Sequence, residues 1–199
     1  MPSETTSDLT LRERNKLAAQ RHVQDVAVGL FREHGYAAVT VEAIARAAGV
    51  GAATVYRYFG SKEGIVSWNE SIQRLQHGGL DFTGSEPPAR VLRRTFVETI
   101  PDGYRETRDL DRVKALYDVP EIFGISAVND HRSTVALIET LNEQCPQLEP
   151  IAATTLAYTA VAALDAALYQ WQLHDGARPL GQLVADAFDA IEQQWSDAS

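Results

Sequence analysis

Apolar side chains recur three or four positions apart along most of the chain, which is the period of an α-helix. The first clear stripe runs from Val23 to Phe31 and ends at His34 and Gly35, where glycine can take the left-handed conformation that closes a helix. No strand-like alternation of useful length and no fixed-period repeat interrupts this pattern. The pattern therefore predicts an all-α fold.

Two short helices are predicted on either side of a tight turn. Thr40 is the expected N-cap of a helix over Val41–Ala48, and Gly49–Gly51 form the turn. The next helix is expected over Ala52–Phe59 and stops at Gly60.

A longer helix is expected to follow, capped by Ser61 and running through Trp68 and Ile72 towards Leu75. Residues 78–88 are rich in glycine, proline and serine and are expected to form a loop. Five further helical runs, separated by prolines, are Ala89–Ile100, Arg108–Tyr117, Ala127–Glu143, Ile151–His174 and Leu180–Trp195.

The second short helix has two different sides. With 100° between successive side chains, Val55 and Phe59 lie within about 40° of each other and face the core. Ala53, Tyr56 and Arg57 lie on the opposite side, where small residues let the backbone approach base edges and longer ones reach phosphates. Such a helix pair suits a helix-turn-helix, but it also suits a plain helical hairpin with a solvated face.

The charge is unevenly placed along the 199 residues. The chain carries 18 basic and 27 acidic residues, so its formal charge of -9 opposes nucleic-acid binding by the molecule as a whole. Residues 1–62 nevertheless have a net charge of +2, and +4 without the first eight. An N-terminal arm is expected over residues 1–19. Its basic residues Arg12, Arg14 and Lys16, together with Arg21 just beyond the arm, are expected to follow a phosphate backbone.

Other kinds of site find little support. With 45% apolar residues the chain can bury a core, and it has no secretory leader, so we expect a cytoplasmic protein. The lone Cys145 is expected to be structural, with a thiol sensor as the alternative. The five histidines lack metal-ligand spacing, and no phosphate-binding loop or nucleophile elbow is present, so we expect no metal, no cofactor and no enzyme activity.

The stretch Ile151–Leu173 is long enough to span a bilayer, but it is mostly alanine and threonine and contains Asp165. It is expected to be buried on most sides, inside a helical bundle or at a subunit interface.

Four sequence landmarks lie close together between Val23 and Trp68. They are LFREHGY at 30–36, T-V-x-x-I-A-x-x-A-G-V at 40–50, T-V-Y-R-Y-F at 54–59 and S-K-E at 61–63. This run closely resembles the DNA-binding domain of TetR-family transcriptional regulators. The remaining chain agrees with that family only in length, helicity and number of helices.

The resemblance implies a homodimer with a three-helix DNA-binding domain over 20–64 and an effector-binding and dimerisation domain of about six helices over 65–199. The residues expected to approach bases are Ala52, Ala53, Thr54 and Tyr56, those expected to hold phosphates are Thr40, Tyr58 and Lys62, and Arg57 suits either role. Residues 51–53 are Gly-Ala-Ala where many relatives have polar or longer side chains, so base contacts there are expected to involve thymine methyl groups.

The last two long helices are the expected dimer interface. The residues expected to pack there are Ala160, Ala163, Ala167, Val184, Phe188 and Trp195, because alanines allow close approach and the aromatic rings fill gaps. The alternative is that both helices pack inside one subunit.

An effector site is expected in the second domain. Its candidate lining residues are Trp68, Phe96, Ile100, Tyr104, Tyr117, Phe123 and Tyr158. Asp165 is either an exposed residue, an interface partner for an arginine or a polar anchor in that site. Aromatic lining with few charges favours an apolar or amphipathic ligand.

The resulting hypothesis is a dimeric repressor that a small ligand releases from a palindromic operator in double-stranded DNA. The alternatives are an activator or ligand-independent regulator of the same fold, and an all-α binding or enzymatic protein that does not bind DNA.

Overall fold

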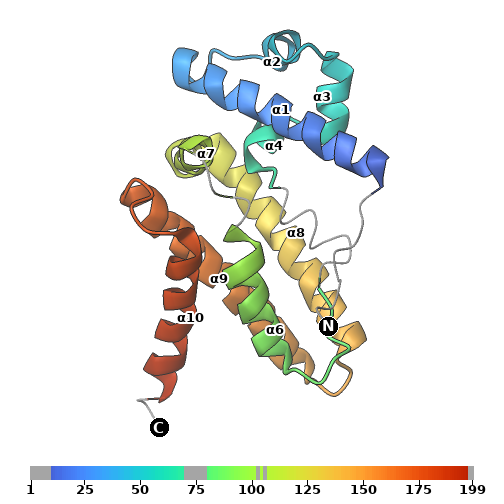
Figure 1. Ribbon diagram of the computed structural model, residues 1–199, viewed down its shortest axis with the longest axis vertical. Helices are drawn as coiled ribbons and strands as arrows, with labels where there is room; N and C mark the ends of the chain where they lie inside the picture. Colours follow the sequence, from blue (N-terminus) through green and yellow to red (C-terminus); the bar gives the residue numbers. More distant parts are fainter. Residues whose placement is uncertain (1–9, 70–79, 102–103, 105–106, 197–199) are drawn as a thin grey trace. The chain divides into compact units, whose positions relative to one another are not determined.

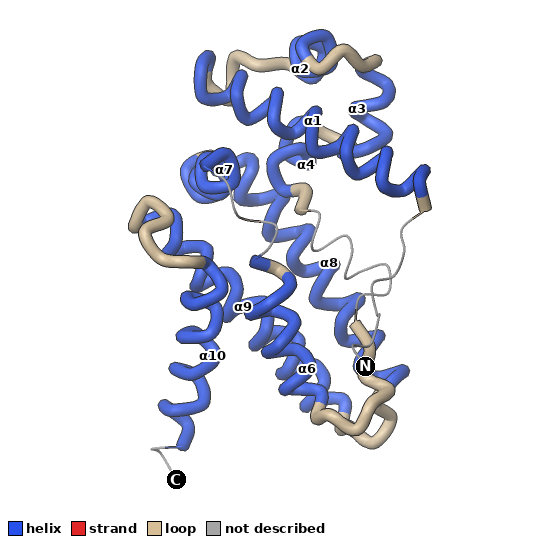
Figure 2. The backbone as a smooth tube through the Cα atoms, viewed as in Figure 1, coloured by secondary structure: helices blue, strands red, loops and turns tan. Residues whose placement is uncertain are grey.

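The computed structural model describes residues 10–69, 80–101, 104 and 107–196, and every regular element within them is helical (Figures 1 and 2). The helices of the first part are α1 (Leu11–His34), α2 (Val41–Ala47), α3 (Ala52–Phe59) and α4 (Lys62–Ser67). Those of the second are α6 (Pro88–Arg94), the π-helix η2 (Thr95–Thr99), α7 (Thr107–Asp118), α8 (Pro120–Gln144), α9 (Pro150–Leu173) and α10 (Leu180–Ser196). The all-α prediction is confirmed.

The chain forms two compact units, one ending at Trp68 and one beginning at Asn69. The boundary lies four residues beyond the predicted one. Both short helices are where the sequence placed them, and α3 has the predicted bounds. Gly35, Gly49 and Gly60 have positive φ, as their positions after helices require.

The N-terminal arm predicted over residues 1–19 is wrong from Leu11 onwards, because α1 begins there. Thr10 caps the helix: its Oγ1 accepts the backbone N–H of Glu13 at 3.3 Å, and the Glu13 carboxylate accepts the backbone N–H of Thr10 at 2.8 Å. This capping box satisfies two backbone donors that a flexible arm would leave to water. Residues 1–9 lie outside the described part of the chain.

The helix that begins after Ser61 is shorter than predicted. Trp68 has an extended backbone, with φ -65° and ψ 131°, so the prediction that α4 continues through it is wrong. Gln24 on α1 supplies the physical reason, since its side-chain amide donates to the carbonyls of Ile65 and Trp68 at 2.6 and 2.8 Å. In a longer helix the Ile65 carbonyl would accept the N–H of residue 69. Ile72 and Leu75 lie outside the described residues.

Two boundaries in the second unit also differ from prediction. Helix α8 begins at Pro120, seven residues before the predicted Ala127, because proline is pre-organised for the first helical turn. The run predicted over 89–100 changes at Thr95 from α-helix to π-helix. Here α10 approaches closely: a Cβ on Gly181 would lie 2.9 Å from the Val97 carbonyl oxygen.

Each unit has its own core. In the first, Val23, Ile44, Val55 and Ile65 come from four different helices and are at most 1% exposed. In the second, α9 packs against α7, α8 and α10, and its inward face consists largely of alanines. Short side chains on α9 allow these neighbouring helices to come close.

The predicted dimer interface is wrong in its residues. Five of the predicted interface residues are instead buried in the core of a single subunit, each at 8% exposure or less: Ala160, Ala163, Ala167, Val184 and Phe188. Phe188 packs edge-on against Phe96, with ring centroids 6.5 Å apart. These five residues therefore pack within one subunit, and a dimer interface formed by the last two helices stays a prediction. The side chain of Trp195 lies outside the described part of the chain.

Within a single subunit α9 is buried on one side only, so burial on most sides stays a prediction that requires a subunit interface. Its outer face exposes Ile151, Tyr158, Tyr169 and Leu173, each by 45% or more. Among the described residues α9 is the one helix long and apolar enough to cross a membrane, although its alanine face is packed in the core of the second unit.

Candidate nucleic-acid interface

Helix α3 has only two turns, and both of its ends are set by glycine. Gly51 is the N-cap, and its carbonyl accepts the backbone N–H groups of Thr54 and Val55 at 2.8 and 3.3 Å. Gly60 closes the helix with φ 75°, and its N–H donates to the carbonyl of Tyr56. The chain therefore turns tightly at both ends of α3, which allows the helix to lie at the surface.

The side of α3 opposite Val55 is exposed, as predicted. Ala53, Tyr56 and Arg57 are exposed, whereas Val55 is 1% exposed. Phe59 is half-buried, and its ring meets that of Trp68 edge-on at 6.1 Å. The exposed side thus begins with a methyl group and continues with a phenol and a guanidinium.

Arg57 lies along this exposed side between the Thr54 hydroxyl and the Tyr58 ring. Its Nη2 is 3.5 Å from the Oγ1 of Thr54, and its guanidinium carbon is 5.4 Å from the ring centroid of Tyr58. Thr54, Tyr58 and Ala52 are half-buried, so their outer atoms remain accessible. A guanidinium held in this way can bind a guanine edge or a phosphate through two parallel hydrogen bonds.

Thr40 has a structural task that leaves it able to bind an anion. It is exposed at the N-cap of α2, where its Oγ1 accepts the N–H of Ala43 at 3.1 Å. The hydroxyl still has a hydrogen to donate. This arrangement is compatible with the phosphate contact that the resemblance implies.

Lys62 has a contact that the sequence did not predict. Its Nζ donates to the carbonyls of Tyr36 and Val39 at 2.9 and 3.0 Å and lies 4.0 Å from the centroid of the Tyr36 ring. These bonds tie the start of α4 to the turn between α1 and α2. Two of the three ammonium donors are used in these bonds, which we call the Lys62 brace, so Lys62 stabilises the first unit in addition to any other contact that it makes.

Tyr36 and Glu63 complete the same brace and were not predicted as functional residues. The Tyr36 hydroxyl donates to Oε1 of Glu63 at 2.5 Å, and the Tyr36 ring packs on Phe31 at 5.0 Å. Burial acts to raise the pKa of Glu63, but hydrogen bonds, led by that from Tyr36, and the charge of Lys62 lower it overall. The signal was in the quoted landmarks, which contain Tyr36, Lys62 and Glu63 together.

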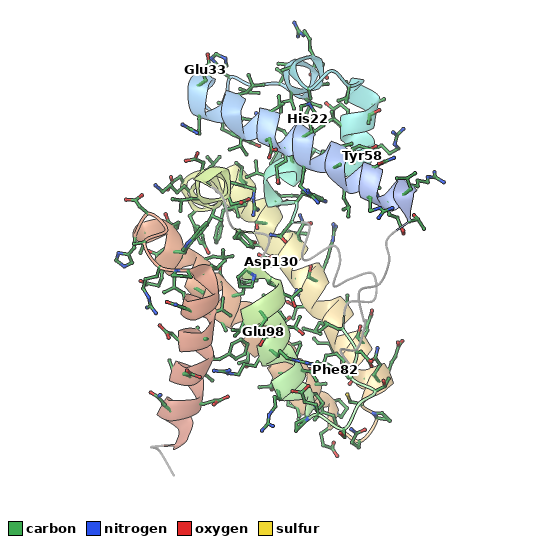
Figure 3. The ribbon with its side chains drawn as sticks, in the orientation of Figure 1. His22, Glu33, Tyr58, Phe82, Glu98 and Asp130 are labelled. Carbon is green, nitrogen blue, oxygen red and sulfur yellow. The ribbon has the colours of Figure 1, made fainter. Side chains whose placement is uncertain are left out.

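Two polar side chains of α1 also hold this unit together. His22 has its Nε2 3.2 Å from the carbonyl of Ala48, the C-cap of α2 (Figure 3). Gln24, which is 8% exposed, makes the two hydrogen bonds to α4 described above. Both lie beside the apolar stripe of α1, and the stripe alone gave no sign of these partners.

In the second unit, the structure brings three predicted effector residues together. Tyr117 lies between two rings, with centroids 6.4 Å from Phe123 and 5.4 Å from Tyr169. Its hydroxyl is 2.6 Å from Oδ1 of Asp165, which is exposed as the first of the three interpretations expected. Tyr169 was not predicted. We refer to Tyr117, Phe123, Asp165 and Tyr169 as the aromatic cluster.

Asp130 on α8 adds a second carboxylate near this cluster (Figure 3). It contacts solvent, yet the surrounding protein and the charge of Asp165 raise its pKa to about 6, against a hydrogen bond to Ser126 that lowers it. Burial and the hydrogen bond to Asp165 likewise raise the pKa of Tyr117, which stays protonated at neutral pH.

The other predicted effector residues lie elsewhere. Phe96, Ile100 and Tyr104 are at most 7% exposed and belong to the core of the second unit. Tyr158 is exposed on α9, with its hydroxyl 3.3 Å from Nδ1 of His131. Trp68 belongs to the first unit, so the structure does not group it with the others.

Comparison with known proteins shows similarity to one family over the first unit. Residues 24–67 match the family model described as "Bacterial regulatory proteins, tetR family". The chain is 28% identical over 184 residues to MftR of Mycobacterium tuberculosis, a protein named for transcriptional regulation of mycofactocin biosynthesis, covering 89% of this chain and 91% of that protein.

Two solved structures share the fold over most of both chains. The SmeT–triclosan complex has a TM-score of 0.54 at 18% identity, covering 87% of this chain and 91% of that chain. NalD of Pseudomonas aeruginosa, a secondary repressor of a multidrug efflux pump, has a TM-score of 0.52 at 19% identity, covering 87% and 96%.

The brace makes a prediction about stability. We expect Lys62→Met to lower the opening free energy of α2 and α3 by about 1.5–3 kcal/mol, because hydrogen bonds from a charged donor to two carbonyls are lost. The measurement is native-state hydrogen exchange of the full-length protein. The exposed Lys16, changed to Met, is the matched control and should alter that energy by less than about 0.5 kcal/mol. Unchanged protection in Lys62→Met would show that the brace contributes nothing.

Proposed function

We infer that the chain is a ligand-responsive transcriptional repressor of the TetR family of bacterial regulatory proteins, whose family model matches residues 24–67. It binds a DNA operator through α3, and a small molecule bound by the second unit releases it. The family model matches only the first unit, so the functions assigned to the second are our proposals.

The observation that carries the DNA-binding proposal is the surface of α3. An eight-residue helix with an apolar inward side exposes Tyr56 and Arg57, and is held by glycine turns and by the Lys62 brace. A recognition helix requires this combination, because its exposed side must enter the major groove while the rest of the domain keeps it in place. We assign base contacts to the exposed side of α3, and phosphate contacts to Thr40 and Tyr58.

We further propose a homodimer that reads a palindromic operator. One recognition helix makes few base contacts, and each good bidentate contact contributes roughly 1–3 kcal/mol of discrimination. A two-fold dimer doubles the contacts and matches its symmetry to that of the operator. The named NalD repressor shares the fold, which supports repression rather than activation.

The dimer surface that we propose is the outer face of α9, not the alanine face predicted from the sequence. Its exposed residues, three or four positions apart, are Ile151, Thr155, Tyr158, Ala162, Asp165, Tyr169 and Leu173. This stripe follows a 24-residue helix, about 36 Å long, and is mostly apolar. An apolar stripe of that length favours a covered face, and a second copy of the same helix can cover it.

For the effector we propose a small apolar or amphipathic molecule that contacts the aromatic cluster. The SmeT structure of the same fold is a complex with triclosan, which supports a small-molecule ligand. Aromatic rings offer apolar surface, and the carboxylate of Asp165 offers a polar contact at its edge. We propose no catalytic role for any residue and place the protein in the cytoplasm, where its DNA target lies.

The two assigned roles on α3 make different predictions for DNA binding. We expect Arg57→Gln and Tyr56→Phe to change which sequences are selected from a random DNA pool, with losses of about 1–3 kcal/mol on the wild-type operator. Tyr58→Phe should weaken binding to all sequences alike, since a phosphate contact carries no sequence information. Equal effects of the three substitutions on preference would contradict the assignment, and absence of salt-sensitive binding by the wild type would contradict the function.

The proposed interface makes a prediction about oligomeric state. We expect Ala162→Glu to convert the dimer into a monomer with unchanged helicity, because two like charges would face each other across the two-fold axis. Sedimentation equilibrium measures the mass. Ala89→Glu places the same change at an exposed position in the first turn of α6 and should leave the dimer intact. A dimeric Ala162→Glu variant would remove α9 from the interface.

The aromatic cluster makes a prediction about ligands. In a thermal-shift screen of acyl, aromatic and polycyclic compounds, we expect at least one class to stabilise the wild type, by about 2.7 kcal/mol at 100 times its Kd. Tyr117→Phe keeps the ring and should keep most of this shift, whereas Tyr117→Leu should lose it. A flat response to every class, or an unchanged shift in Tyr117→Leu, would count against the proposed site.

A further inference from the structure

Side chains from three helices of the second unit meet at the aromatic cluster. On α8, Phe123 and Asp130 are seven positions apart, so they lie on the same side of the helix, two turns from each other. On α9, Asp165 and Tyr169 are four positions apart and also share a side. The Tyr117 ring of α7 lies between the other two rings, and its hydroxyl donates to Oδ1 of Asp165. Aromatic rings and two carboxylates therefore come together at one place.

The negative charge of these two carboxylates is not balanced by the described residues around them. The surrounding protein and the charge of Asp165 together raise the pKa of Asp130, so each carboxylate makes ionisation of the other less favourable. Within the described part of the chain, neither of them forms an ion pair. A cation bound beside both would remove the repulsion between them.

The neighbouring helix α7 has cations, but they have other partners. Two of them have described side chains. The Arg112 guanidinium is 3% exposed, lies 4.9 Å from the centroid of the Tyr104 ring and is 3.9 Å from the carboxylate of Asp109. Lys114 donates to Oδ1 of Asp175 at 2.5 Å. The two carboxylates of the cluster are thus left to a positive charge that a ligand can supply.

We propose that the effector is a cationic amphipathic molecule, whose positive group binds between Asp130 and Asp165 and against the rings of the aromatic cluster. This inference rests on the proposed function, because it names the chemical class of ligand for the effector site proposed above. An organic cation is attracted both by the face of an aromatic ring and by a carboxylate. Phe123 and Tyr169 are 51% and 45% exposed, so ring surface is available to it. An anionic ligand would instead meet two like charges.

The test compares three probes that share a decyl chain and differ in the charge of the head group. Decyltrimethylammonium is cationic, decyldimethylamine oxide is net neutral and decanoate is anionic. Isothermal titration calorimetry measures their affinities for the full-length protein at about pH 8, where a pKa of about 6 leaves Asp130 ionised. We expect the cation to bind at least about tenfold more tightly than either of the other probes, because it alone gains attraction from both carboxylates.

Three substitutions separate the site from the negative charge of the chain as a whole. Asp130→Asn and Asp165→Asn each remove one charge and keep the shape, and the amide oxygen at position 165 can still accept the Tyr117 hydroxyl. The matched control is Glu139→Gln. Glu139 is exposed on α8, nine positions from Asp130, and therefore on the opposite side of the helix.

We expect each asparagine substitution to weaken binding of the cation by about tenfold and to leave the affinity for the amine oxide unchanged, which also shows that the variant is folded. Glu139→Gln should change neither affinity. Equal affinities of the wild type for cation and amine oxide, tighter binding of decanoate, or an equal loss in Glu139→Gln would overturn the inference.

Tyr117→Leu distinguishes failure of this inference from failure of the proposed effector site. If the wild type prefers the neutral or the anionic probe and Tyr117→Leu loses that binding, the cluster remains the effector site and the cationic class is wrong. If no probe binds in a way that depends on Tyr117, the inference and the proposed effector site are both overturned.

Discussion

The structure depends on how two turns of helix are held at the surface of the first unit. An isolated helix of this length is unstable in water, because its few hydrogen bonds do not offset the cost of nucleation. Helix α3 is therefore stabilised by the burial of Val55, which is 1% exposed, and by its packing against α2 and α4. The same burial fixes which side chains remain outside, so the packing of one valine also sets the orientation of Tyr56 and Arg57.

Polar contacts complete what the apolar core begins. An apolar core can tolerate small rotations of the short helices, whereas hydrogen bonds are directional and specify one arrangement. Lys62, Tyr36 and Glu63 connect the beginning of α4 to the turn before α2, and Gln24 defines where α4 ends. A lysine that resembles a phosphate ligand in sequence thus acts first within the protein. The side chains that we propose to contact DNA and those that support α3 are therefore different, although they lie only a few positions apart.

In the second unit the comparable constraint is the composition of α9, which is apolar on both sides. One side packs into the core of its own subunit through alanines, and Trp171 packs against Tyr104 with ring centroids 6.2 Å apart. The opposite side carries larger exposed groups such as Ile151 and Tyr169. One side of such a helix packs in the core of its own subunit, and the other side is exposed and can contact a second subunit. The aromatic cluster lies at the edge of that second face, since Asp165 and Tyr169 belong to both.

Local chemistry was sufficient to predict much of this protein from its sequence. The helical period, the N-caps Thr40 and Ser61, and glycines such as Gly35 and Gly60 act over a few residues, so they specified the helices and the exposed side of α3. Tertiary structure decided where partners come from distant positions. Gln24 ends α4 from 41 residues away, the Lys62 ammonium bonds carbonyls 23 and 26 residues back, and the alanines of α9 face their own core. Periodicity shows that a helix has an apolar side, but only the folded chain determines what covers it.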